Sequence, residues 1–469
     1  MTISIEQLDK WLVLPSETEH LEFKEAKSRF DFEELVGYCV ALANEGGGNM
    51  VLGVTDKPPR QIVGTNAFDT PAKTVAGIHQ RLHFKVEYTE LAHSNGRVLV
   101  FTVPSRPKGH PVQYNGKYLM RAGEELAPMS PEQLKKIFEE GKPDFLQEIA
   151  ISGIEGTDVV RLLDTQSYFD LLNLPYPENR AGVLDRFQRE GFIAKANANY
   201  DITNLGVILF AKSLDEIPAL SRKAVRVVAY EGTNKLKTRL DQMGHKGYAV
   251  GFQGLVDFIN SQIPTNEVIE KAIRKTVKMF PEIAIRELVA NALIHQDFNE
   301  GGSSVVVEIY SDRVEVSNPG LPVITTDRFI DEYQSRNERL ANMMRRFGVC
   351  EELGSGIDKV VDSAEVFQLP APDFRVGQIR TTAILYAHRE FDEMSKEDRV
   401  RACYQHCCLR YVMNEKMTNQ SLRDRFKLSE KKLDAVSRVI RDTVERNLIK
   451  LEDPENASRR YAKYVPFWA

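Results

Sequence analysis

The sequence has few cysteines and no long apolar run, and each scarcity excludes a class of protein. Its 469 residues include 5 cysteines, too few and too irregularly spaced for the disulfide framework of a small secreted domain. The apolar runs at 36–43 and 205–211 are far shorter than the roughly 18 residues that span a membrane. The N-terminal segment lacks the apolar stretch of a secretory signal. We therefore expect a cytoplasmic protein with no membrane partner.

The composition is that of a globular protein with several domains. With 42% hydrophobic and 28% charged residues, a chain of 469 residues fits about three domains. Strand-like and helix-like segments alternate in residues 1–128 and again in 201–390, which predicts an α/β multidomain protein. Residues 129–200 are interpreted as a helical connector. Residues 391–469 are interpreted as a winged-helix domain.

Several elements are predicted inside the second α/β region. The apolar run 203–212 is interpreted as a strand, and 253–296 as a long helical stretch. Residues 305–318 alternate as two strands around a Ser311–Asp312 turn, which predicts a β-hairpin.

The charge is unevenly distributed along the chain. The net charge is -5, yet residues 399–469 contain 16 Lys and Arg against 9 Asp and Glu, a net charge of +7. A basic end on an acidic body favours a surface that faces nucleic acid. A solvated basic surface without a partner is the alternative.

The basic end has a helix–turn–helix rhythm. Residues 419–451 predict two helices around a short turn, and 453–465 would form the wing of a winged helix-turn-helix domain. In such a domain the second helix enters the major groove, although a winged helix can also serve for dimerisation or packing. The charge does not separate DNA from RNA. The side chains expected to contact nucleic acid are Lys431, Lys432, Arg438, Arg441, Arg459 and Arg460.

A small group of metal-type ligands lies in the same region. On a helix, Cys403, His406 and Cys407 share one face and could hold zinc. Because no second ligand pair of suitable spacing lies nearby, the other interpretation is a set of buried thiols in a helical core.

Three acidic residues near the N-terminus form the first candidate site. Glu17 and Glu22 stand before and within a predicted strand, and Asp56 ends another. If the strands pair, three carboxylates suit Mg²⁺ or Mn²⁺, which can activate water against a phosphodiester. Lys24 lies on the same strand face as Glu22 and could hold a phosphate or the attacking water. A polar strand face with surface ion pairs is the alternative.

The surrounding motifs resemble a known domain. ETEHLEFKEA (17–26), ALANEGGGNMVLGVTD (41–56) and YLMRAGEELAPMSPEQL (118–134) are similar to the Schlafen AlbA-like domain, formerly described as a divergent AAA domain. The resemblance implies an α/β nucleic-acid-binding domain. It also implies that the metal-binding acids of Schlafen nucleases, which cleave tRNA, match Glu17, Glu22 and Asp56. Those nucleases use a doubled domain that clamps tRNA, so a comparable clamp built from the single copy here would require a homo-oligomer.

The glycines that follow the predicted helix 32–44 have two interpretations. Gly46–Gly48 can expose backbone N–H groups to phosphate, or they can let the chain turn tightly between the helix and the next strand.

A helix in the second α/β region forms the second candidate site. In residues 280–298, Glu287, Asn291 and His295 follow at intervals of four, so they lie on one face of a helix. A carboxylate can orient water as a catalytic group, and an Asn oxygen can bind Mg²⁺. A helix with a polar solvent-facing stripe is the alternative.

Three motifs in order resemble the GHKL ATPase/kinase superfamily, in the branch of RecG-like, Schlafen-domain-containing bacterial regulators. They are RELVANALIHQDF, DRVEVSNPGLP (312–322) and EELGSGIDKVV (351–361). The resemblance implies an α/β sandwich that binds ATP and Mg²⁺, with Glu287 and Asn291 in its first motif. Asn318 stands where the superfamily has an adenine-reading Asp, so adenine selectivity and hydrolysis stay open. The other positions matched to nucleotide contacts are Gly320, Gly354, Ser355 and Gly356.

Three functions are compatible with these features. The first is a nucleotide-regulated nucleic-acid-processing protein with a metal-dependent RNase site of the tRNA-cleaving type, and the resemblance links such proteins to antiviral (phage) defence. The second is an ATP-sensing, DNA-binding transcriptional regulator that cleaves nothing. The third is an ATPase that remodels a partner.

Overall fold

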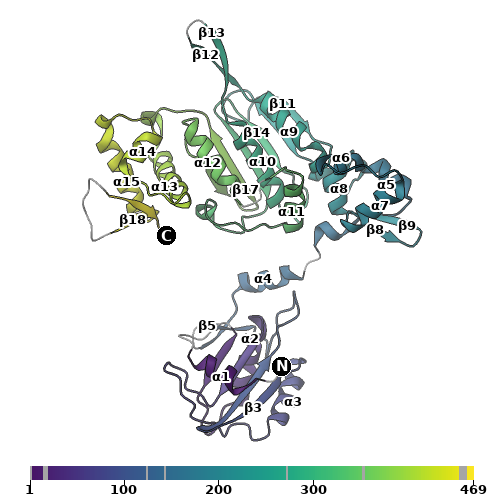
Figure 1. The fold of residues 1–469 in the computed structure, drawn as a ribbon, viewed down its shortest axis with the longest axis vertical. Helices are drawn as coiled ribbons and strands as arrows, with labels where there is room; N and C mark the ends of the chain where they lie inside the picture. The colour runs from purple at the N-terminus through teal and green to yellow at the C-terminus, as the bar shows by residue number, and fades with distance from the viewer. Residues whose placement is uncertain are drawn as a thin grey trace. The chain divides into compact units, whose positions relative to one another are not determined.

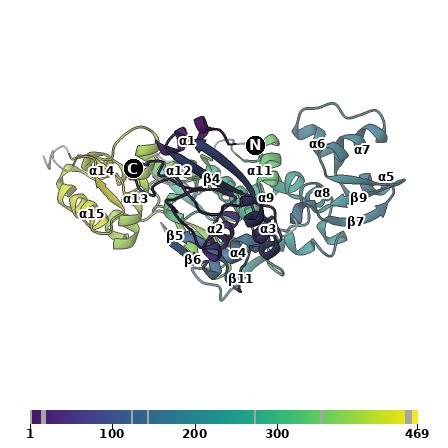
Figure 2. The same ribbon diagram turned by 90° about the horizontal axis from the view of Figure 1, so that it is seen from below.

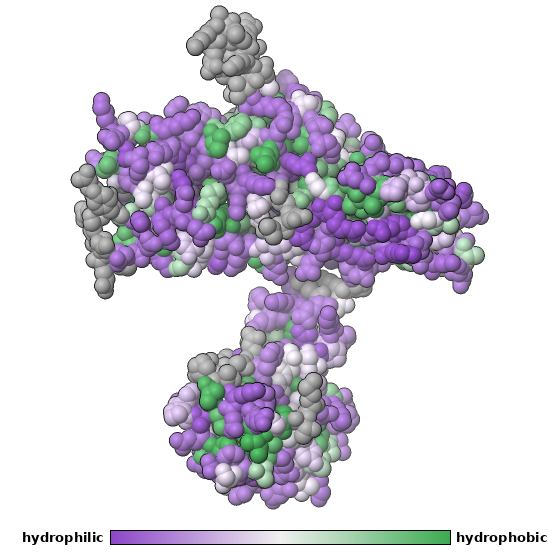
Figure 3. Space-filling view, viewed as in Figure 1, coloured by the Kyte–Doolittle hydropathy of each residue, from purple (hydrophilic) through white to green (hydrophobic). Residues whose placement is uncertain are grey.

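The computed structural model describes residues 3–13, 20–122, 125–141, 144–270, 273–350, 354–453 and 462–469. It divides into two compact units, residues 1–143 and 144–469. The expected α/β multidomain architecture is confirmed, because both units contain sheets and helices (Figure 1). On the face shown in Figure 3, hydrophilic side chains cover most of the second unit, whereas apolar side chains gather on part of the first unit.

The first unit is built on a four-stranded sheet. Its strand order is β1-β2-β4-β3, with β1 parallel to β2 and the other pairs antiparallel. The hairpin β5-β6 packs on α2. The bounds are α1 Ile5–Leu12, β1 Leu21–Lys24, α2 Phe32–Asn44, β2 Gly48–Leu52, α3 Pro71–Leu82, β3 Glu87–His93, β4 Gly96–Val103, β5 Leu119–Ala122, β6 Glu125–Pro128 and α4 Pro131–Glu140.

Side chains alternate across this sheet, so both of its faces are buried. Met50 and Leu52 pack with α2 and α3 in one apolar cluster, while Val51 packs with Leu8 of α1 in another. Because one strand supplies both clusters, β2 is held at the centre of the unit. The acidic and basic residues near its end are thereby fixed in place.

The second unit begins with a three-stranded sheet where a helical connector was expected. Helices α5, α6 and α7 accompany strands β7, β9 and β8, which pair in that order. Figure 2 shows these helices beside β7 and β9. The hairpin turns at Asn197, which has a positive φ of 57°. Short strands that pair only after the chain folds back are weakly marked in sequence. The bounds are β7 Ile149–Ile154, α5 Gly156–Leu162, α6 Thr165–Leu171, α7 Arg180–Arg189, β8 Ile193–Ala196 and β9 Asn199–Thr203.

A six-stranded sheet follows, in the order β11-β10-β14-β15-β17-β16. Only β10 and β14 among its pairs in the described chain are parallel. The bounds are α8 Asn204–Phe210, β10 Arg226–Tyr230, β11 Thr238–Met243, α9 Tyr248–Gln262, β12 Thr265–Glu270, β13 Ile273–Lys278, α10 Glu282–His295, β14 Val306–Ile309, β15 Arg313–Pro319, α11 Glu338–Arg346, α12 Gly356–Val366, β16 Asp373–Val376 and β17 Arg380–Tyr386.

This sheet has one apolar and one charged face. Val314 and Val316 are buried against the helix layer, in which α10 packs on α9 and α12. Glu315, between them, faces Glu308 across the hairpin β14-β15 and pairs with Arg313 at 2.6 Å. This clean alternation is typical of a sheet with one solvated face, so the domain has two layers.

The predicted hairpin at 305–318 is present as β14-β15, but two other predictions were wrong. The run 203–212 forms the helix α8, whose residues are all buried, rather than a strand. Periodicity cannot distinguish a short buried helix from a buried strand. The stretch 253–296 is not one helix, because the hairpin β12-β13 separates α9 from α10. Pro264, between α9 and β12, disfavours helix in the residue before it.

The C-terminal part of the second unit is a helical layer with a short hairpin. Its apolar cluster includes Ile330 and Val361 of the preceding domain, so it packs directly on that domain. Met417 forms an isolated bridge with Tyr464. The bounds are α13 Lys396–Val412, α14 Asn419–Arg425, α15 Leu433–Glu445, β18 Ile449–Leu451 and β19 Tyr464–Pro466.

Candidate functional site

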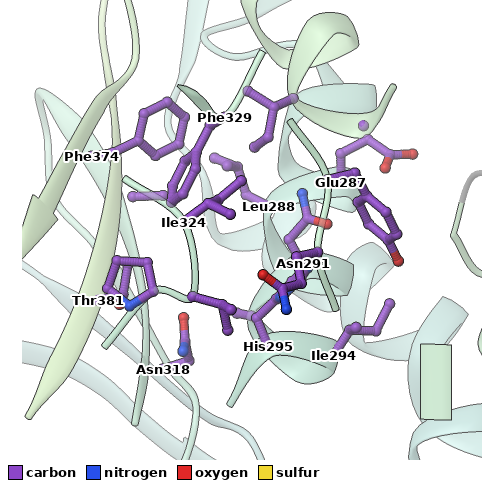
Figure 4. Close-up of a pocket in the computed structure, with 18 of the residues that line it drawn as sticks. Glu287, Leu288, Asn291, Ile294, His295, Asn318, Ile324, Phe329, Phe374 and Thr381 are labelled. Atoms are coloured by element: carbon purple, nitrogen blue, oxygen red, sulfur yellow. The ribbon is translucent and has the colours of Figure 1, made fainter. Parts of the chain in front are cut away.

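A pocket lies between α10 and the six-stranded sheet. Glu287, Asn291 and His295 line it from one helix, as their spacing predicted. Asn318 and Thr381 face them from β15 and β17 (Figure 4). Apolar and aromatic side chains complete the lining, among which are Leu288, Ile324, Phe329, Tyr333 and Phe374.

Two glycines bring backbone close to the pocket. A Cβ on Gly356, the first residue of α12, would lie 2.8 Å from Glu287 Oε2 and 3.5 Å from Asn291 Nδ2. Gly354 has a positive φ of 74°, and a Cβ there would lie 2.9 Å from Tyr333 Cβ. Any side chain at Gly356 would fill the space beside the carboxylate and the amide. The absence of a side chain therefore leaves the start of α12 open toward Glu287 and Asn291.

The strand side of the pocket is fixed by backbone geometry. Asn318 Nδ2 donates to the Pro319 carbonyl at 3.0 Å. Thr381 Oγ1 donates to the Gly320 carbonyl at 2.8 Å. Gly320 and Ser355 adjoin lining residues, but they are not among the described residues that line the cavity. Gly320 has a positive φ of 96°, which favours glycine and lets the chain leave β15.

Burial shifts the pKa of two groups around the pocket. Burial, with a smaller effect of Arg336, lowers the pKa of His295 to about 4. His295 is therefore neutral at pH 7. Burial, with a smaller effect of Asp331, raises the pKa of Asp358 in the first turn of α12 to about 6. One oxygen of Asp358 is buried without a hydrogen-bond partner.

This arrangement fits a nucleotide. The aromatic and aliphatic side chains offer surface for a base, while a carboxylate and an amide oxygen lie beside a glycine at a helix N-terminus. Backbone N–H groups at such a terminus favour an anion such as phosphate. Glu287 and Asn291 supply oxygen atoms of the type that Mg²⁺ prefers. Sequence reasoning missed Thr381, Phe329 and Phe374, because single Thr and Phe residues carry no motif.

The N-terminal carboxylates lie around one lysine. Lys24 Nζ is 2.8 Å from Glu22 Oε1 and 3.8 Å from Asp56 Oδ2, so the predicted convergence of β1 and the end of β2 brings these residues together. Burial opposes the charge of Lys24, but its hydrogen bond and its charge interaction with Glu22 raise its pKa above the usual value. Glu17 lies outside the described residues.

A second cation binds the other oxygen of Glu22. Arg121 of β5 lies 3.1 Å from Glu22 Oε2 and 2.8 Å from Glu45 Oε2. The Glu22 side chain has 0% exposure, and that of Arg121 has 8%. Glu22 is therefore enclosed between two cations. Sequence reasoning missed Arg121 and Glu45, although each is a charged residue inside a motif quoted above.

The glycines after α2 serve a tight approach of backbone segments. A Cβ on Gly48 would lie 2.6 Å from the His20 carbonyl oxygen, and one on Gly47 would lie 2.7 Å from Ser105 N. His20 Nδ1 lies 2.7 Å from the Gly47 carbonyl oxygen. These contacts support the tight-turn interpretation of the glycine run.

No group of three or more His, Cys, Asp or Glu that could hold a metal is found among the described residues. His406 Nδ1 lies 3.0 Å from Glu365 Oε2 and its Nε2 lies 3.2 Å from Ser421 Oγ. Burial raises the pKa of Cys403 to about 12, and Cys407 is buried as well. The thiols are therefore part of a helical core.

Four of the basic residues predicted to contact nucleic acid lie on α15 or just before it. Arg438 and Arg441 are exposed on this helix, and Lys431 is exposed just before it. Lys432 is half-buried, and its Nζ lies 3.0 Å from Asp392 Oδ2. Arg459 and Arg460, with most of the predicted wing, lie outside the described residues.

Two family models match the chain. Residues 17–130 match the model "Schlafen, AlbA_2", and residues 302–385 match the model "Putative ATP-dependent DNA helicase recG C-terminal". No curated protein matches the chain. Within the described residues, no helix is long and apolar enough to cross a membrane.

Two solved structures are similar to this chain, one over most of its length and the other over a smaller part. The DIP2311 protein from Corynebacterium diphtheriae has 17% sequence identity and a TM-score of 0.44, over 98% of this chain and 96% of that one. The N-terminal domain of a RecG-related protein from Nitrosomonas europaea has 19% identity and a TM-score of 0.21, over 28% of this chain and 92% of that one.

The family matches cover the N-terminal cluster and part of the pocket, whose α10 residues Glu287, Asn291 and His295 precede the RecG-type match. The Schlafen match contains the Lys24 cluster and Arg121, and the RecG-type match contains Asn318, Gly354 and Thr381 of the pocket. An ATPase-like domain implies ATP binding. The chain therefore matches a Schlafen AlbA_2 model and, further along, a RecG-type C-terminal model, and this pair of matches supports a nucleotide-dependent, nucleic-acid-related protein.

Proposed function

We propose that the protein processes nucleic acid under the control of ATP. ATP and a divalent cation, Mg²⁺ or Mn²⁺, bind in the pocket of α10. The observation that carries this proposal is the meeting of three separate sequence motifs in one cavity, through Glu287, Asn291, Asn318, Gly354 and Gly356. Asn291 contributes a metal-binding oxygen, and Glu287 orients water near the phosphates.

The Schlafen-type domain is the proposed catalytic part, an endoribonuclease for tRNA-like RNA. Glu22 and Asp56, with Glu17, would hold the metal, which would stabilise the charge of the phosphodiester. Lys24 lies between two of these carboxylates, where its ammonium can pair with a substrate phosphate. A homo-oligomer would supply the second domain copy of a tRNA clamp, and phage defence is the proposed setting.

The C-terminal elements are the proposed nucleic-acid-binding module, a winged helix. Three helices are followed by the hairpin β18-β19, the order of elements in that motif. Arg438 and Arg441 are exposed on α15, the helix in the recognition position, with Lys431 before it. Phosphate contacts of this kind position a protein without reading sequence.

Cleavage assays test the catalytic part. Purified protein is incubated with tRNA, rRNA and duplex DNA in Mn²⁺ or Mg²⁺, with and without ATP. We expect RNA cleavage that is lost in Asp56→Asn, whose side chain is 39% exposed. The matched control is Asp69→Asn, an exposed aspartate before α3. Equal cleavage by the two variants would remove Asp56 from the site.

Nucleotide binding is tested separately. Calorimetry with an ATP analogue and Mg²⁺ should show binding by the wild type and at least tenfold weaker binding by Asn291→Ala. Asn260→Ala, on α9, is the control. Equal affinities of the wild type and Asn291→Ala would contradict the assignment.

One observation favours a second function, that of an ATP-sensing transcriptional regulator. Both oxygens of Glu22 are engaged by Lys24 and Arg121, and the side chain is fully buried. A carboxylate in that state has no free oxygen for a metal. Tight binding to an operator-like duplex, without cleavage of any substrate, would favour this function.

A further inference from the structure

One wall of the nucleotide pocket is the segment 326–334, here called the pocket wall. Phe329, Glu332, Tyr333 and Gln334 of this segment line the cavity. The ring of Phe329 also packs edge-on against Phe374 of β16, with centroids 5.2 Å apart. The position of this segment therefore sets the shape of the side that faces α10.

The C-terminal end of the chain contacts the pocket wall from its other side. Tyr404 Oη of α13 donates to the Asp327 carbonyl at 2.6 Å. The Arg328 guanidinium lies over the Trp468 ring, 4.8 Å from its centroid. Trp468 Nε1 donates to Tyr404 Oη at 3.3 Å, which joins the two contacts. We call Tyr404 and Trp468 the C-terminal clasp.

Apolar packing reinforces the clasp, and ion pairs within the pocket wall hold Arg328 in place. Ile330 is 7% exposed and belongs to the same apolar cluster as Cys403 and Cys407 of α13. Arg328 also donates to Asp331 at 2.8 Å and lies 2.9 Å from Glu332. The pocket wall is thus attached to the C-terminal module by a backbone hydrogen bond, an aromatic contact and a buried side chain.

The helix α12 provides a second connection between the same two regions. It begins at Gly356 in the pocket and carries Glu365 in its last turn. Glu365 lies 3.0 Å from His406 Nδ1 of α13 and 3.3 Å from Arg425 Nε of α14. The side chains of His406 and Arg425 are 3% and 1% exposed. Both structures beside the pocket are therefore anchored to the module that carries α15.

We propose that the C-terminal clasp holds the pocket wall in its nucleotide-binding position and thereby links nucleotide binding to the state of the C-terminal module. This inference rests on the proposed nucleotide site and adds its regulation. A wall held in place before the ligand arrives avoids an ordering cost on binding, so release of the clasp weakens nucleotide affinity. Because coupling between two sites is reciprocal, bound nucleotide also stabilises the clasp. Nucleic acid bound at α15 changes nucleotide affinity whenever it alters the clasp.

The two tryptophans of the chain, Trp11 and Trp468, allow a direct test. In a Trp11→Phe background, Trp468 alone reports on the clasp, and titration with an ATP analogue and Mg²⁺ should change its fluorescence. The fluorescence midpoint should match the affinity from calorimetry. In the otherwise wild-type chain, Trp468→Ala should weaken nucleotide affinity about fivefold or more, within the usual range of coupling between sites. Trp468→Phe keeps a ring over Arg328 and should stay within about twofold of the wild type.

The outcomes separate the inference from the proposed site. If the wild type binds no nucleotide, the proposed site itself is refuted. If the wild type binds but Trp468 fluorescence is unchanged and Trp468→Ala binds as tightly, the clasp is refuted while the site stands. Weak binding by Trp468→Ala supports the clasp only if its far-ultraviolet circular dichroism and the affinity of Trp468→Phe match the wild type. Equal weakening in both Trp468 variants would count against it.

Discussion

Replacing Arg121 by alanine tests the ion network that encloses Glu22. The substitution removes the guanidinium that lies 3.1 Å from Glu22 and 2.8 Å from Glu45, and it leaves a fully buried carboxylate with Lys24 as its remaining cation. Removing one partner of a buried ion pair costs about 3–5 kcal/mol. Because Lys24 still neutralises one oxygen, we expect the lower end, about 3 kcal/mol. With a slope of about 2 kcal/mol per M, the urea midpoint falls by about 1.5 M.

Trp11 provides the assay for this prediction. It is partly buried against the apolar cluster of the first unit, so in a Trp468→Phe background its fluorescence follows unfolding of that unit in urea. Arg81→Ala is the matched control, since its side chain is 37% exposed and pairs with the exposed Glu33. It should cost at most about 1 kcal/mol. Coincident midpoints for Arg121→Ala and Arg81→Ala would refute the reasoning.

Three further substitutions test the second unit. Gly356→Ala places a Cβ 2.8 Å from Glu287 Oε2 and should weaken ATP affinity, measured by calorimetry, at least tenfold. Gly254→Ala is the control, because a Cβ at Gly254 has nothing within 4 Å and should leave ATP affinity unchanged. Equal ATP affinities of the two variants would contradict the close approach of Gly356 to Glu287. Burial raises the pKa of Asp358 to about 6, so the folded wild type loses stability as pH rises from about 4 to 6. Asp358→Asn should gain about 1 kcal/mol over the wild type across that interval, after allowance for solvent screening, and a pH-independent difference in melting temperature would be evidence against it. Arg438→Ala should weaken nucleic-acid binding uniformly across sequences and lower the salt slope by about 1, and an unchanged slope would remove Arg438 from the interface.

The elements that were predictable from sequence are those with local signals. The Asp31 side chain caps α2 by accepting a hydrogen bond from Glu34 N at 2.9 Å. The helix ends shortly before Gly46, which has a positive φ of 101°. Ser130 and Gln133, three residues apart in sequence, form the reciprocal hydrogen bonds of a capping box at α4. Helix caps, turns and amphipathic periods depend on residues close in sequence, so they can be predicted from a single sequence.

The elements that were missed depend on the surroundings. The helix α8 is buried on every side, so its run of apolar residues carries no period. Arg121 and Glu22 are 99 residues apart, and only the folded sheet brings them together. The same holds for Arg328 and Trp468, whose contact crosses from the pocket wall to the end of the chain. Sequence motifs located both candidate sites, but the partners that control them come from tertiary structure.

The two candidate sites differ in how ready they are for a ligand. In the pocket, Asn291 is half-buried and lines the cavity, so its side chain is accessible to a nucleotide that enters. In the N-terminal cluster, a metal can reach Glu22 only after Lys24 or Arg121 leaves one of its oxygens. Substrate phosphates are the groups best suited to draw these cations away, because both side chains bind phosphate as they bind carboxylate. A nuclease built on this cluster would therefore bind its metal more tightly with RNA present than without it. Mn²⁺ affinity measured with and without an uncleavable RNA distinguishes this order of binding from a preformed metal site, for which the two values would be equal.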